Sequence, residues 1–94
     1  WQRLPALSLK RLQYFVTLAQ LRQFTATASR LAISQPARSS ALRQMATVLG
    51  GKLVNRTAAT ATLPELGAAI LPHARRIHRV AQATFSDMKQ IVEA

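Results

Sequence analysis

The segment over residues 25–49 most constrains the fold, because it reads as two short helices joined by a tight turn. Thr25 is a candidate N-cap of the first helix, and the turn falls at residues 32–33. Ser34 can cap the second helix, whose first turn holds Pro36, where the missing N–H costs nothing. The pattern therefore predicts a compact, rigid helix-turn-helix unit.

The second helix of this unit has two faces of different chemistry. Its apolar side repeats at three- and four-residue spacing through Leu42, Met45 and Leu49. Its opposite side carries Gln35, Ser39, Ser40 and Arg43. A helix with a packed back and a small, polar, basic leading end suits entry into the major groove of DNA.

The charge distribution indicates a polyanionic partner. Residues 1–64 hold no Asp or Glu but nine of the 13 Lys and Arg, and the whole chain has a formal net charge of +10. A compact domain with so one-sided a charge repels itself unless it meets a polyanion. Nucleic acid and an anionic membrane surface are the obvious candidates.

Length and composition set further bounds. The 94 residues suffice for one domain, or a small domain with an appended helix. Without cysteine the chain forms no disulfide and no thiolate metal site. The longest apolar stretch, residues 66–71, is too short to span a bilayer, and Lys10 and Arg11 interrupt any signal-peptide core. Because the chain begins at Trp1, we expect it to be part of a longer protein.

Around the central unit, residues 1–7 are predicted to be a leader, and Ser8 to cap a helix ending at about residues 20–22. The apolar repeat of that helix comprises Leu9, Leu12, Phe15, Val16 and Ala19. Phe24 is expected to anchor the next helix to this one. Gly50-Gly51 should end the third helix, with one glycine in a left-handed conformation.

A small two-stranded wing is predicted next. Residues 52–56 form a short β-like run, residues 58–60 a turn, and residues 61–63 a strand that pairs back. Pro64-Glu65 then begins a last helix, with an acid in the first turn where the helix dipole favours it. Pro72 predicts either a kink or a slightly later start of this helix.

The last helix carries a continuous apolar stripe that is longer than so small a core can cover. The stripe consists of Ile70, Ala74, Ile77, Ala81, Phe85, Met88 and Val92. We expect it to pack against the same helix of a second copy, with Ala74 and Ala81 allowing a close approach.

Several short motifs follow one another at a recognisable spacing. They are Leu9-x-x-Leu12-x-x-Phe15, Phe24-Thr25-x-x-Ala28-x-x-Leu31, Ser34-Gln35-Pro36-Ala37-x-Ser39, Leu49-Gly50-x-x-Leu53, Arg56-Thr57 and Leu63-x-Glu65-x-Gly67. Together they resemble the N-terminal DNA-binding domain of LysR-type transcriptional regulators, over about residues 8–92.

The resemblance implies an all-α fold with a small two-stranded wing: a winged helix-turn-helix over residues 8–63 and a linker helix for dimerisation over 64–94. It implies sequence-specific binding of double-stranded DNA by a cytoplasmic bacterial regulator, as a homodimer or, at full length, a tetramer. A separate C-terminal domain, absent from this chain, would bind a small-molecule effector. No cofactor, enzymatic activity or membrane partner is expected for the chain itself.

Some positions depart from the family pattern. Ser40 replaces a common arginine, Arg38 stands where an apolar residue is usual, and Met45-Ala46 replaces Leu-Glu. The wing over residues 58–62 lacks the arginines often found there, and Pro64 replaces a threonine cap. These changes leave the fold intact and bear on base preference and wing contacts.

The candidate DNA contacts are Thr25, Ser34, Gln35, Pro36, Ala37, Arg38, Ser39, Ser40, Arg43 and Arg56. Gln35 is the favoured base reader, since an amide can bond adenine bidentately, and Arg43 a favoured phosphate contact. Arg38 either enters the groove or snorkels from the core edge. Arg56 either reaches a phosphate or ties the wing to a helix. Lys10, Arg11 and Arg30 are assigned to a solvated face.

Other functions remain open. His73 and His78 are five residues apart without a neighbouring acid, which argues against a metal site. A basic domain with a long amphipathic helix could also bind anionic membrane surfaces, although Asp87 and Glu93 oppose this. Binding of RNA without sequence specificity is a further alternative, which the scarcity of exposed aromatic residues disfavours.

Overall fold

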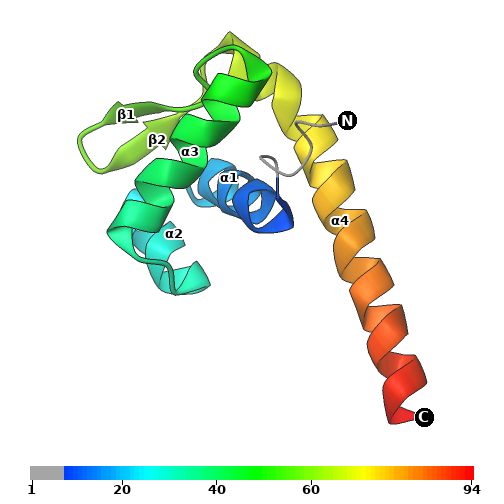
Figure 1. Ribbon diagram of the computed structural model, residues 1–94. Helices are drawn as coiled ribbons and strands as arrows, with labels where there is room; N and C mark the ends of the chain where they lie inside the picture. Colours follow the sequence, from blue (N-terminus) through cyan, green and yellow to red (C-terminus); the bar gives the residue numbers. More distant parts are fainter. Residues whose placement is uncertain (1–7) are drawn as a thin grey trace.

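The computed structural model describes residues 8–94, except for the side chains of Gln35, Pro36, Arg38 and Ser39. The predicted leader over residues 1–7 lies outside the described residues. Within them, helix α1 occupies a central position between α2, α3 and the wing on one side and α4 on the other (Figure 1). The elements are α1 (Leu9–Leu21), α2 (Phe24–Leu31), α3 (Gln35–Leu49), β1 (Asn55–Thr57), β2 (Thr60–Thr62) and α4 (Glu65–Glu93).

Helix α1 is the core around which the other elements pack. It begins as predicted, because the Ser8 Oγ accepts a hydrogen bond from the Arg11 N–H at 3.3 Å. Its buried residues are Leu12, Tyr14, Phe15, Val16, Thr17, Leu18 and Ala19. They surround the helix instead of forming one stripe, as a central helix requires. Leu9, the first position of the apolar repeat, is 57% exposed and takes no part in the core.

Helix α2 begins earlier than the sequence predicts. Its N-cap is Gln23 and not Thr25, and its first residue, Phe24, is buried. The reason is a long-range contact: the Phe24 N–H donates to the Ala59 carbonyl at 3.2 Å, which fixes the chain just before the helix. The helix ends at Leu31, and its C-cap, Ala32, has the left-handed conformation at φ 52°.

Helix α3 has the predicted ends. The Ser34 Oγ accepts from the Ala37 N–H at 3.4 Å, and Gly50 ends the helix at φ 86°, with its N–H donating to the Ala46 carbonyl. Met45 and Ala41 are buried against the core. The expected helix-turn-helix is therefore formed by α2, a turn at residues 32–33, and α3.

The wing is present but shifted along the chain from its predicted position. Strands β1 and β2 pair antiparallel, with Arg56 opposite Ala61. Leu53 and Val54, predicted as strand residues, instead lie in the core before β1 begins. A third segment completes the sheet edge: the Ala61 N–H donates to the Arg22 carbonyl at 2.7 Å, and Gln23 bridges Thr60.

Helix α4 begins at Glu65 and continues through Pro72 to Glu93, so the later start was wrong. Its 29 residues correspond to about 43 Å of helix at 1.5 Å per residue. Near its start, Gly67 lies against the main chain of Leu53, where no larger residue fits. Leu71 and Ala74 are buried in the domain, and the helix then leaves the core (Figure 1).

Candidate nucleic-acid interface

Helix α3 presents a polar outer face, because its opposite face packs on the core. Arg43, Gln44 and Thr47 are exposed, whereas Ala41 and Met45 of the same helix are buried. The side chains of four predicted contacts, Gln35, Pro36, Arg38 and Ser39, lie outside the described residues. Their backbone forms the first turns of α3, which is where the sequence placed them. Their contacts with DNA remain predictions.

Two residues on this outer face were missed from the sequence. The Gln44 Nε2 donates to the Ser40 Oγ at 3.1 Å, and the Thr47 Oγ1 donates to the Arg43 carbonyl at 3.0 Å. The signal was available in the helical spacing, since each follows a candidate contact by four residues. The exposed amide of Gln44 adds a second possible reader to a helix whose sequence suggested only Gln35.

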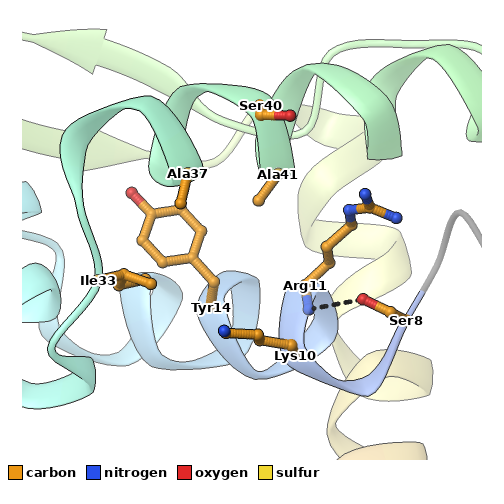
Figure 2. A pocket seen from close by; sticks show the side chains of 8 residues that line it. All are labelled: Ser8, Lys10, Arg11, Tyr14, Ile33, Ala37, Ser40 and Ala41. Carbon is orange, nitrogen blue, oxygen red and sulfur yellow. Dashed lines mark hydrogen bonds between the residues drawn. The ribbon is translucent and has the colours of Figure 1, made fainter.

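Ser40 and Ala37 lie at the junction between α3 and α1. They line a pocket of about 210 Å³ with Ile33, Tyr14 and residues at the start of α1 (Figure 2). Ala37 is exposed, whereas Ser40 is half-buried. Figure 2 shows Lys10 and Arg11 across the pocket from these α3 residues. The cations assigned to a solvated face therefore lie beside the leading half of α3.

The wing and the start of α2 form one continuous surface. Thr25 is exposed in the first turn of α2. The Arg56 guanidinium lies over the Phe24 ring, 4.6 Å from its centroid, and the Arg56 Nε donates to the Ala58 carbonyl at 3.3 Å. Of the two roles predicted for Arg56, the structure shows the contact that ties the wing to a helix.

The distal half of α4 exposes a row of large apolar side chains. Ile77, Phe85, Met88 and Val92 are 46%, 61%, 55% and 84% exposed. Val80 and Ile91, missed from the sequence, follow Ile77 and Met88 by three residues and are exposed at 58% and 76%.

The proximal part of the predicted stripe faces inward. Ala74 is only 2% exposed and Ile70 packs against the same core, so the close approach of a second helix at Ala74 was wrong. Ala81 is half-buried. The uncovered part of the stripe therefore begins at about Ile77, where α4 leaves the domain.

Other kinds of site find little support in the described part of the chain. Among residues 8–94 no three His, Cys, Asp or Glu side chains gather where they could hold a metal ion. Within the same residues no helix has the length and apolar character needed to cross a bilayer. The exposed Arg43 of α3, with Lys10 and Arg11 beside that helix, thus remains the basic feature of this surface.

These elements define a winged helix-turn-helix with a long C-terminal helix, a class of fold used to hold one helix against DNA. Residues 9–68 match the family model described as a bacterial regulatory helix-turn-helix protein of the lysR family. The chain belongs to this family.

Individual relatives agree with this assignment. The chain is 42% identical over 74 residues to the HTH-type transcriptional regulator CfxR of Cupriavidus necator, covering 79% of this chain and 23% of CfxR. The oxidized form of OxyR from Corynebacterium glutamicum superimposes with a TM-score of 0.82 at 33% identity, covering 86% of this chain and 26% of OxyR. A structure of the CbnR DNA-binding domain in complex with DNA gives a TM-score of 0.76 at 28% identity, covering 90% and 98% of the two chains.

The chain spans about a quarter of the length of the curated relatives it matches. The comparisons therefore concern the DNA-binding end of such regulators.

Proposed function

We propose that this chain is the DNA-binding and dimerisation part of a transcriptional regulator, which recognises specific double-stranded DNA with the leading end of α3. The observation that carries the proposal is the presentation of α3. Its back is fixed by Ala41 and Met45, while Arg43 and Gln44 are exposed. A helix held in this way can enter the major groove without losing its packing.

The electrostatics support the same partner. Residues 1–64 contain no acidic side chain, so no acid in that segment offsets the positive charge of its bases. An ion pair between the Lys89 Nζ and Glu93, at 3.7 Å, lies at the far end of α4. Lys10 and Arg11 beside α3 extend the basic surface toward α1. In this arrangement phosphates orient the domain, and the first turn of α3 reads bases.

Dimerisation follows from the uncovered apolar row of α4. Side chains such as Phe85 and Ile91, more than half exposed, are costly to leave in water along one helix face. Packing against the same helix of a second copy covers them. The dimer then presents two α3 helices to two half-sites that we expect to lie about one turn of DNA, 34–36 Å, or a multiple of it apart.

The longer protein implied by the length of the relatives would contain a separate domain for a small-molecule effector. We propose that it acts in the bacterial cytoplasm, as a dimer or tetramer, and that the part described here has neither cofactor nor catalytic role. Binding of RNA without sequence specificity is disfavoured by the aromatic residues. Tyr14, Phe15 and Phe24 are buried, so among the Phe and Tyr side chains of residues 8–94 only Phe85 is exposed, and it belongs to the dimer face.

The test is selection of bound sites from random duplex DNA, followed by salt titration on the selected site, unrelated duplex, RNA and anionic vesicles. A selected site bound at least 100-fold more tightly than unrelated duplex supports the proposal. Equal binding to all four polyanions would instead establish a nonspecific basic module.

A further inference from the structure

The side chain of Arg56, in strand β1 of the wing, makes two contacts within the domain. The Arg56 guanidinium lies over the face of Phe24, 4.6 Å from the ring centroid. The Arg56 Nε donates to the Ala58 carbonyl, 3.3 Å away, in the turn that joins the two strands. One side chain thus contacts the wing turn and the first residue of α2, which lie more than 30 positions apart in the chain.

Two backbone hydrogen bonds near the Arg56 side chain join the wing to the segment that leads into α2. The Phe24 N–H donates to the Ala59 carbonyl at 3.2 Å, and the Ala61 N–H donates to the Arg22 carbonyl at 2.7 Å. Phe24 is 8% exposed, so its ring is fixed in the core and offers a stationary face. The wing is therefore docked on the segment that leads into α2, and the cation–π contact lies across that joint.

We propose that Arg56 is a positioning residue, which clamps the wing against the start of α2 and supports DNA binding through this geometry instead of through a phosphate contact of its own. The inference rests on the proposed DNA-binding function.

The reason lies in how the guanidinium is already used. Its Nε donates to the Ala58 carbonyl and its face lies on the Phe24 ring, so two contacts hold the side chain at the joint between the wing and α2. The wing tip, residues 58–59, carries only alanine methyl groups. The wing tip can therefore contribute to DNA binding only through its shape and its backbone. That contribution requires the wing to be held in place relative to α2 and α3.

The first experiment measures the clamp without DNA. Hydrogen exchange is followed by NMR at the Phe24 and Ala61 amides in the native chain, in Arg56→Gln and in Lys52→Gln, which removes a nearby exposed charge. We expect exchange at both amides to quicken roughly two- to five-fold in Arg56→Gln only, the factor that corresponds to an exposed cation–π contact. Unchanged exchange in Arg56→Gln would overturn the clamp, whether or not the chain binds DNA.

The second experiment separates clamp from phosphate contact. Pentafluorophenylalanine at position 24 keeps the shape of the ring and every charge of the chain, but removes the attraction for a cation. The control is the same replacement at Phe15, which is fully buried in α1. On the selected DNA site we expect replacement at position 24 to lower affinity about as much as Arg56→Gln, and the control to leave affinity unchanged.

Salt dependence completes the test. If Arg56 contacts a phosphate in each half of a dimer, Arg56→Gln should flatten the slope of log K against log salt by about 1.8. The clamp predicts weaker binding with the slope unchanged. A flattened slope, or full affinity with the fluorinated ring at position 24, would overturn the inference while leaving the proposed function intact. A native chain that bound no DNA would defeat the proposed function and leave the exchange result standing.

Discussion

The contact between Gly67 and Leu53 allows a quantitative test of how α4 is attached. A Cβ built on Gly67 would lie 2.9 Å from the carbonyl carbon of Leu53 and closer still to its oxygen. Leu53 is 2% exposed, so its main chain cannot yield without disturbing the core. Moving α4 away instead would expose Leu71 and Ala74.

For Gly67→Ala two effects oppose each other. Helix propensity favours alanine by about 1 kcal/mol. Overpacking against a rigid neighbour costs about 1–3 kcal/mol, and a main-chain obstacle places this site at the upper end. We therefore expect the free energy of unfolding to fall by about 1–2 kcal/mol.

Thermal unfolding followed by circular dichroism should show this as a melting temperature lower by roughly 5–15 °C. The control is Ala68→Gly, at the exposed neighbouring position of the same helix, which should lose about 1 kcal/mol through propensity alone. If Gly67→Ala melted at or above the native temperature, the close approach of α4 to Leu53 would be refuted.

Four further outcomes are expected. The double variant Ile77→Asp, Met88→Asp should sediment as a monomer, and an unchanged dimer would remove α4 from the interface. Binding should fall steeply with salt, with a slope of about −5 to −7 if a dimer uses three or four bases per subunit; a slope near zero would rule out phosphate contacts. Gln35→Ala should lose about 1–3 kcal/mol on the selected site and much less on unrelated DNA, whereas Arg43→Ala should weaken both alike, as competition binding would show. Ala32→Gly should raise the free energy of unfolding by up to about 1 kcal/mol, because it relieves a left-handed alanine at φ 52°; a loss of stability in chemical denaturation would contradict this.

Features of the fold with a local cause could be predicted from the sequence. Ser34 and Gly50 bound α3 as expected, because a cap depends on side-chain and backbone chemistry within a few residues. The existence of the wing and of the long last helix was predicted for the same reason.

Features with a long-range cause could not be predicted. Thr25 had the chemistry of an N-cap, but α2 starts at Phe24 because Ala59, distant in the chain, holds that amide. The wing shifted because Leu53 is needed in the core and its carbonyl lies against Gly67. Periodicity likewise showed the apolar stripe of α4 without showing that α1 already covers Ala74.

Part of the candidate DNA-binding site could also be predicted from the sequence. The leading turn of α3 was placed correctly, since it follows from the Ser34 cap. The position of Lys10 and Arg11 beside α3 depends on how two helices cross, which spacing along one helix does not encode. The contact of Arg56 with Phe24 also joins distant segments, and the sequence left two roles open for it.

Helix α4 is attached to the domain over a short part of its length and extends far beyond it, so a small rotation of the helix is amplified at its free end. The domain holds the first ten residues or so of the helix, up to the buried Ala74, and the rest extends beyond it (Figure 1). Over an arm of about 30 Å, set by the helical rise, a rotation of about 5° at the point where the helix leaves the domain moves the free end by roughly 2–3 Å. By the same mechanics, a small shift imposed on the free end changes the angle at which each domain meets its half-site. The segment just after Ala74, where α4 leaves the domain, is therefore the place at which a small change of angle has the largest effect on the free end.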